Sequence, residues 1–296
     1  MLHIYMAIFR FREDRVPYAV ITGFFLLDLA AFFFIQNPWV LVVWAGLGLI
    51  PKGHICAWNH HHQHVATFVH APMNRALELM LGLMTGITSN LWVLHHSIGH
   101  HVNYLDQRKD ESRWQNPDGT VMSELWYTFE VGVTAYSRAW EVSKKHPQHR
   151  RQFVLMGLLT AAVVAGLIAL KPFAGVVLFL FPMVFGLFFT AWATYSHHSG
   201  KNTANHFVAS NNILHKGYNI LTGNLGLHTA HHYKPGVHWS KLPELHEEIA
   251  EKIPADCYLT PGFPWTLGQT PQPDGQEPET TSPGLEPVAV PQKSAA

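Results

Sequence analysis

Four long apolar segments constrain the fold of this chain more than any other feature of its sequence. Each approaches the roughly 20 residues that an α-helix needs to cross the hydrocarbon core of a bilayer. The segments are Tyr18–Gln36, Trp39–Trp58, Gln152–Leu170 and Phe173–Tyr195. The sequence therefore predicts an all-α integral membrane protein with four transmembrane helices.

Short links that contain proline join these segments in pairs. Asn37 and Pro38 separate the first two segments, and Lys171 and Pro172 separate the last two. Because proline interrupts a helix and so short a link leaves no room for another element, we predict two helical hairpins. Both hairpins then open toward the same side of the membrane.

Basic residues identify that side as cytoplasmic, by the positive-inside rule. Lys171 is nearly alone on the opposite side. No small-residue cleavage site follows the first apolar run, so we expect a retained anchor rather than a cleaved signal peptide. Both termini are then cytoplasmic. The basic residues on the open side are Arg10, Arg12, Arg15, Lys52, Arg108, Lys109, Lys144, Lys145, Arg150 and Arg151.

The predicted organisation has three parts: a cytoplasmic N-terminus (1–17), a membrane domain (18–261) and a tail (262–296). The tail is rich in Pro, Gly and Glu and poor in apolar residues, so we expect it to be disordered. The chain has 20 basic and 20 acidic residues, and this balance does not suggest nucleic-acid binding. Cys56 and Cys257 provide no disulfide framework and are expected to be reduced and structural.

Two further features lie within the predicted membrane domain. Asp28 places a carboxylate inside the first segment, where it is a candidate for function, although a hydrogen bond within the bundle is the simpler interpretation. The stretch Ala76–Leu94 has apolar residues at helical spacing. A crossing would put the histidines on either side of it on opposite faces of the membrane, so we predict an interfacial helix. Its partly polar face would be made of Glu78, Thr85, Thr88, Ser89 and Asn90.

The polar region 100–150 has helical potential around Met122–Lys145. With the segments that follow the fourth span, it would form a cytoplasmic helical cap. Most of the 22 histidines fall in or next to this cap, in four clusters: WNHHHQHVATF, LHHSIGHHVNYLD, ATYSHHSG and LHTAHHY.

The spacing of these histidines predicts metal binding. The pattern is H-x3-H (His60, His64), H-x3-HH (His96, His100, His101), a pair (His197, His198) and H-x2-HH (His228, His231, His232). Helical residues three or four apart have Cβ atoms about 5–6 Å apart, so two imidazoles can bind one metal or reach two neighbouring metals. The extra histidine of each pair points toward a second ion. Imidazole-rich sites suit Fe, Zn, Cu or Ni. We therefore predict a two-metal site, almost entirely of imidazole, at the cytoplasmic mouth of the bundle.

The remaining histidines are weaker candidates. His61 and His95 point off the chelating face of their clusters, while His206 and His215 are open candidates for a place near the site. Isolated histidines are usually polar surface residues, and this is what we expect of His3, His54, His70, His146, His149, His238 and His246.

With its histidine clusters in this order, the sequence resembles the membrane-bound fatty acid desaturase family. This family consists of non-haem di-iron enzymes whose histidine clusters are called histidine boxes. The resemblance covers most of residues 15–255 and rests on HxxxH, HxxxHH and HxxHH combined with two hairpins. It implies that two iron ions and O₂ remove hydrogen from an unactivated C–H pair of a fatty acyl chain, which introduces a double bond. Close relatives hydroxylate lipids, and some convert free fatty acids to terminal alkenes by oxidative decarboxylation.

Carried over to this chain, the resemblance implies a set of iron ligands. Stearoyl-CoA desaturases also use an N-x3-H element before the last box, but Ala193 and Thr194 stand where its Asn would be. Which of His197 and His198 binds iron therefore stays open. The implied ligands are His60, His64, His96, His100, His101, His228, His231 and His232, with one of that pair.

Other side chains are expected to support the site. His62 is either a ninth ligand or a group that orients a ligand, and Asn59, Asp106, Asp110 and Asn224 are candidates for the orienting role. Trp92, Trp114 and Trp192 are expected either to wall an apolar substrate channel or to pack in the core.

Electrons must come from another protein. The chain has no GxGxxG motif after a strand and no cysteine set for an iron–sulfur cluster. The resemblance implies a donor of the ferredoxin, rubredoxin or cytochrome b5 type. The basic group Lys144, Lys145, Arg150 and Arg151 is a candidate docking patch, although membrane topology alone explains it equally well.

Several alternatives stay open at this point. Desaturation, hydroxylation and decarboxylation differ in the placement of one carbon atom, which the sequence does not define. A substrate with a free carboxylate would require a buried Arg or Lys near the channel, and the sequence indicates no such residue. A di-haem electron carrier or a divalent-metal transporter would need ligands at mid-membrane, where only His54 and Asp28 are near. Chain length, carrier form, regiochemistry and oligomeric state are undetermined.

Overall fold

The computed structural model describes residues 8–260, and every regular element within that range is helical. Four of its helices are long and apolar enough to cross a membrane, which confirms the prediction of an all-α chain with four such helices. They are Arg12–Phe34, Pro38–His64, Pro147–Leu170 and Pro172–His198. The expected disordered tail, 262–296, lies outside the described residues.

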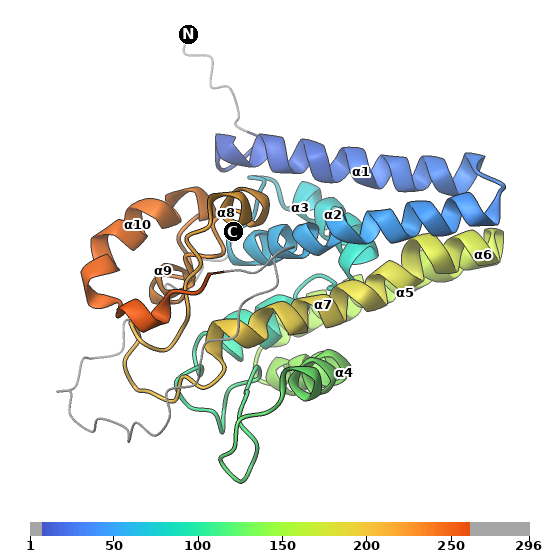
Figure 1. The fold of residues 1–296 in the computed structure, drawn as a ribbon. Helices are drawn as coiled ribbons and strands as arrows, with labels where there is room; N and C mark the ends of the chain where they lie inside the picture. The colour runs from blue at the N-terminus through green and yellow to red at the C-terminus, as the bar shows by residue number, and fades with distance from the viewer. Residues whose placement is uncertain (1–7, 261–296) are drawn as a thin grey trace.

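The first two of these helices lie side by side and are joined by the short link at 35–37 (Figure 1). They are α1 (Arg15–Phe34) and α2 (Pro38–His64). The Asn37 side chain accepts hydrogen bonds from the first N–H groups of α2, and Pro38 occupies a position where an N–H is not needed. Because α2 runs on to His64, the first histidine box lies on its last two turns.

The second pair of apolar segments forms α5 (Pro147–Leu170) and a span in three pieces. These are α6 (Pro172–Gly175), the π-helix η3 (Val176–Leu180) and α7 (Phe181–His198). In Figure 1, α6 and the link between α1 and α2 lie at the same end of the bundle. The C-terminal helices α8 (Lys216–Thr222), α9 (His228–Tyr233) and α10 (Leu242–Ile249) lie at the other end.

The stretch expected to be one interfacial helix is broken in the structure. Helix α3 (Ala71–Thr85) ends early because Gly86 takes a φ of 71°, a left-handed conformation that closes the helix. After a loop comes the π-helix η2 (Val93–Ile98). The expectation of an exposed polar face is also wrong, because the side chains assigned to it are buried: Glu78, Thr85, Thr88, Ser89 and Asn90.

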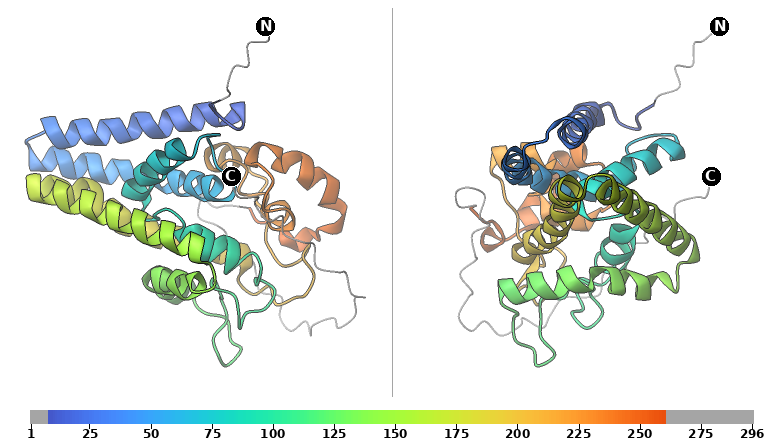
Figure 2. Two further views of the ribbon diagram at one scale, coloured as in Figure 1. Left: turned by 180° about the vertical axis from the view of Figure 1, so that it is seen from behind. Right: turned by 90° about the vertical axis from the view of Figure 1, so that its right-hand side faces the viewer.

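Helix α4 (Glu124–Ser143) instead presents apolar side chains outward. Its N-terminus is capped by the Ser123 hydroxyl, and Leu125, Phe129 and Val133 are exposed along one face. In the right-hand view of Figure 2, which looks along the spans, α4 runs across them. Four short 3₁₀ turns complete the described elements: Arg12–Asp14, Trp239–Lys241, Ala250–Lys252 and Ala255–Cys257.

Two charged side chains meet inside the bundle. Lys52 was expected on the cytoplasmic side, but it is buried and its Nζ lies 2.8 Å from the Asp28 carboxylate. Trp44 donates its indole N–H to the same carboxylate at 2.9 Å, and Lys52 donates to the Leu178 carbonyl at 3.2 Å. The sequence argument failed at Lys52 because it counted charges along the chain and had no means of pairing two helices.

Candidate metal centre and adjoining cavity

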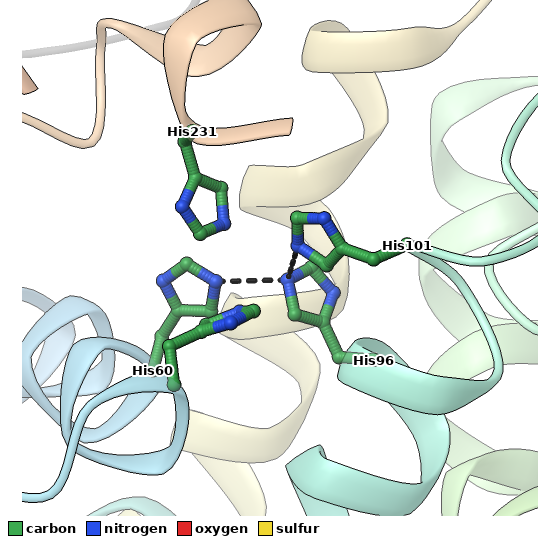
Figure 3. Close-up of side chains that lie close together, drawn as sticks. His60, His96, His101 and His231 are labelled. Atoms are coloured by element: carbon green, nitrogen blue, oxygen red, sulfur yellow. Dashed lines mark hydrogen bonds between the residues drawn. The ribbon is translucent and has the colours of Figure 1, made fainter. Parts of the chain in front are cut away.

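The histidine boxes come from four elements that converge at the end of the bundle occupied by α8–α10. The first box lies at the end of α2, the second begins in η2, His198 ends α7, and the third box forms α9. Figure 3 shows His60, His96, His101 and His231 from three of these elements, with their rings turned toward one another. The second box starts in a π-helix rather than the α-helix on which its spacing was interpreted.

Five histidines form the first group. Each offers one ring nitrogen, and these atoms all lie within 4.8 Å of one another. The Nε2 atom of His96 is 2.8 Å from that of His60 and 3.0 Å from that of His101. We call this set group 1: His60, His64, His96, His101 and His231.

The second group adjoins the first. His100, His198 and His232 offer nitrogens within 4.8 Å of one another. The Nε2 atom of His198 lies 3.0 Å from those of both His228 and His232, and 3.2 Å from that of His100. We call these four residues group 2. The rings of His101 and His232 stack with centroids 4.0 Å apart, so the two groups share a boundary.

The tautomers of two group 2 histidines follow from their other ring nitrogens. Nδ1 of His100 faces a carboxylate oxygen of Asp110 at 2.8 Å, and Nδ1 of His198 faces the Ala209 carbonyl at 3.0 Å. Both oxygens accept, so Nδ1 carries the proton and Nε2 turns a lone pair toward the group. A metal-binding imidazole is held in this way.

The donor set fits a pair of nitrogen-ligated metal ions. Burial, and after it the neighbouring histidines, holds the pKa of His96, His101, His231 and His232 well below the usual range, so these rings are neutral. Nε2 of His231 is buried and has no hydrogen-bond partner within residues 8–260. Neutral imidazoles with free lone pairs are the state that binds iron and similar metals.

His197 and His198 occupy different places. His198 belongs to group 2, whereas His197 belongs to neither group. Nδ1 of His197 lies 3.3 Å from the Asn211 carbonyl, and its ring stacks on His228 with centroids 4.0 Å apart. The sequence analysis did not identify Asn211, because its carbonyl meets the His197 ring only when the chain that follows α7 folds back.

Of the residues expected to orient ligands, Asp110 contacts a grouped histidine. His62 turns away from both groups, to the hydroxyl of Thr67 at 2.9 Å and the Glu78 carboxylate at 3.5 Å. The other three residues bond elsewhere: Asn59 to Thr85 and Ile87, Asp106 to Arg108 and Lys109, and Asn224 to the Trp239 carbonyl.

Two of the histidines expected at the surface are buried. Nε2 of His238 lies 3.0 Å from the Asp14 carboxylate, and His246 packs beside Tyr258. Of the open candidates, His215 caps α8, and Nδ1 of His206 lies 2.6 Å from the Tyr104 hydroxyl.

The two histidines placed off the chelating face are also buried. Nε2 of His61 faces the Thr222 carbonyl at 2.9 Å, so it points toward α8. His95 stacks on Trp92 with centroids 5.5 Å apart and belongs to neither group.

A cavity of about 350 Å³ adjoins the histidine groups. Its walls come mainly from α2 and α7, and most of its lining side chains are apolar. Trp92 and Trp192 line it, as expected of a channel, but Trp114 packs in a separate core against Met122 and Tyr127. Four histidines close one end: His60, His96, His197 and His228.

The comparisons with known proteins agree with this site. The family model described as fatty acid desaturase matches residues 36–261, a range that holds both histidine groups. The searches of curated proteins and of solved structures find no match to the chain.

Proposed function

The chain belongs to the fatty acid desaturase family, and from this premise we propose that it is an O₂-dependent oxidoreductase that introduces a double bond into a fatty acyl chain. One observation carries the proposal: histidines of both groups line the end of a largely apolar cavity. An alkyl chain held in that cavity brings its C–H bonds against the metal ligands.

We assign one iron ion to each histidine group. Group 1 would supply five nitrogen ligands, and group 2 would supply four. When bound, the two iron ions would supply the activation of O₂ and the removal of hydrogen from an unactivated C–H bond. His198 is then the ligand of the pair that ends α7, and His197 lies beside it.

The other residues of the site would orient the ligand imidazoles and the substrate. Asp110 and the Ala209 carbonyl accept hydrogen bonds from the Nδ1–H groups of His100 and His198 and so fix the direction of the Nε2 lone pairs. The apolar walls of the cavity exclude water and hold the substrate carbon in place. Such orientation decides whether a C–H bond near the site reacts.

We further infer that α1 with α2, and α5 with α7, cross the membrane as two hairpins. The links between them lie at one end of the bundle, and α9, which carries the third histidine box, lies at the other (Figure 1). The basic residues near the histidine end make that end cytoplasmic. A soluble electron donor of the ferredoxin, rubredoxin or cytochrome b5 type would then reach the site from the cytoplasm.

The test is mass-spectrometric profiling of lipids and hydrocarbons from cells that express the protein or its His231→Ala variant. New double bonds in acyl chains, absent with the variant, are the expected result. Hydroxylated chains or terminal alkenes would overturn the choice of reaction while keeping the metal centre. A purified protein without bound iron would overturn the proposal as a whole.

A further inference from the structure

Helix α4 carries a stripe of large apolar side chains that residues 8–260 leave uncovered. The stripe consists of Leu125, Trp126, Phe129, Val133 and Trp140, which are between 42% and 81% exposed. These positions recur at helical spacing, so the side chains share one face of α4. Exposed apolar surface gathered in this way marks a contact with a membrane or with another protein.

The stripe adjoins the side of α4 that faces the end of the bundle where the hairpins turn. Val131 packs in one cluster with Ala191 of α7, whereas its neighbour Gly132 lies against the ring of Phe188, which is nearer that end of α7. Phe129 comes three positions before Gly132, so the two residues adjoin on the helix surface. The apolar stripe is therefore directed away from the histidine end.

The other edge of the stripe is polar. Glu130 and Glu141 lie there, and Glu130 pairs at 3.1 Å with Arg113 from the loop that follows the second histidine box. Helix α4 thus has a polar edge on the histidine side and an apolar stripe on the side of the spans. Such a division is typical of a helix that lies in a membrane interface.

Helix α4 also lies at the level where the membrane should end. From Arg151 to Leu170, α5 rises about 29 Å, close to the roughly 30 Å of the hydrocarbon core of a bilayer. Lys171 follows Leu170 and places a charge at the opposite boundary. Since α4 ends at Ser143, just before α5 begins, and runs across the spans in Figure 2, it lies along the membrane surface.

The segment 144–151, which joins α4 to α5 and forms its first turn, holds four basic residues and no acidic one. Lys145 and Arg151 are exposed. We call this stretch the basic segment. The cytoplasmic leaflet of a membrane carries anionic lipids and attracts such groups. An acidic electron donor would also be attracted, but a bilayer accounts for the basic segment and for the apolar stripe together.

We propose that α4 and the basic segment form a binding surface for anionic phospholipids, with the apolar stripe among the acyl chains and the basic segment at the headgroups. Ala139 of α4 packs in one cluster with Leu94 of η2, so this surface would also set the depth of the second histidine box relative to the acyl chains. The inference rests on the crossing of the membrane by the four spans, and it does not depend on the reaction.

Tryptophan fluorescence in nanodiscs of brominated phosphatidylcholine tests the position of the stripe. The difference between the wild type and Trp126→Phe or Trp140→Phe gives the contribution of each ring. We expect both rings to be quenched, and more strongly by bromine near the headgroup end of the acyl chain than by bromine near its methyl end. Trp114→Phe is the control, because Trp114 is buried in the core beneath α4 and should contribute no quenching.

A second tryptophan separates this inference from the crossing on which it rests. Trp39 is 77% exposed at the start of α2, on the opposite side of the proposed membrane. Quenching of Trp39 without quenching of Trp126 or Trp140 would overturn the inference alone. No quenching of any of the three would refute the crossing as well.

Lipid charge tests the basic segment. Brominated phosphatidylglycerol or brominated phosphatidylcholine is added as a minor lipid, and quenching of Trp140, one helical turn before the segment, is compared. Each basic residue should strengthen the preference for the anionic lipid about fivefold, so Lys145→Gln, Arg151→Gln should remove most of it. The control is Lys234→Gln, Lys252→Gln, which removes the same charge from exposed residues of the C-terminal region and should keep the preference.

Two outcomes would overturn the lipid assignment. The first is equal quenching by both lipids in the wild type, or the same loss of preference in both double variants. The second is weaker binding of an acidic ferredoxin by Lys145→Gln, Arg151→Gln with the lipid preference unchanged, which would assign the basic segment to the electron donor. None of these measurements needs catalysis, so an inactive protein could still pass them all.

Discussion

Asp28 and Lys52 form an ion pair inside a bundle of apolar helices, with 2.8 Å between the carboxylate oxygen and Nζ. Each side chain is 1% exposed, and neither histidine group includes either of them. The Trp44 indole also donates to the carboxylate, and Lys52 also donates to the Leu178 carbonyl. Removal of one partner leaves a buried charge with nothing to compensate it, whereas removal of both leaves none.

We expect Lys52→Met to lower the free energy of unfolding by about 3–5 kcal/mol, the usual effect of breaking a buried ion pair. Thermal unfolding of the detergent-solubilised protein measures this. The double variant Asp28→Asn, Lys52→Met should recover most of the loss. Lys144→Met is the control: its pair with Glu141 is exposed, and its loss should change stability by less than about 1 kcal/mol. A double variant as unstable as the single one would mean that the pair is not what holds these helices.

Iron content should separate the two histidine groups. The wild type should bind two iron ions per chain, and His64→Ala and His198→Ala should each lower the ratio toward one by weakening a different group. His197→Ala should keep both ions, because His197 belongs to neither group. Metal analysis of the purified proteins measures the ratio, with His146→Ala as the control outside the site. Loss of iron in His197→Ala together with full retention in His198→Ala would reverse our assignment.

Asp110 should tune group 2 without binding metal itself. Asp110→Asn replaces the charged acceptor of the His100 Nδ1–H by a neutral amide, so the imidazole is held less firmly and is less basic. We expect iron affinity in group 2 to fall about 10- to 100-fold, measured by competition with a chelator. Asp106→Asn is the matched control, since Asp106 pairs with Arg108 and Lys109 outside both groups. Equal losses in the two variants would show that the effect comes from the loss of any nearby negative charge and not from the hydrogen bond between Asp110 and His100.

The sequence was most informative where the geometry is local. Spans follow from runs of apolar residues, and the candidate ligands follow from histidines three or four positions apart, because both patterns depend only on the pitch of a helix. The sequence could not decide between His197 and His198, because that choice depends on which of the two side chains at the end of α7 faces the other histidines. His238 was assigned to the surface because its partner, Asp14, is 224 positions away in the chain.

The errors have the same origin. Lys52 obeys the charge pattern of a cytoplasmic loop, but the fold pairs it with a carboxylate from another helix. The polar residues from Glu78 to Asn90 were assigned to the polar face of one interfacial helix, but they are buried, and Gly86 ends the helix between Thr85 and Thr88.

Gly53 should set the length of chain that the channel accepts. It lines the cavity, and a Cβ atom there would lie 3.1 Å from the Phe189 ring, which lines the cavity as well. A larger side chain must therefore displace this ring or project into the cavity, and both change the space for the substrate. Gly46 is the matched control on the same helix, because it is exposed and a Cβ atom there meets nothing within 4 Å. We expect Gly53→Leu to shift the products toward shorter chains with iron content unchanged, and Gly46→Leu to leave the chain-length distribution as in the wild type. Mass spectrometry of the products measures that distribution. The same profile in both variants would show that the substrate does not pass between α2 and α7, since no alkyl chain could share that space with a leucine side chain.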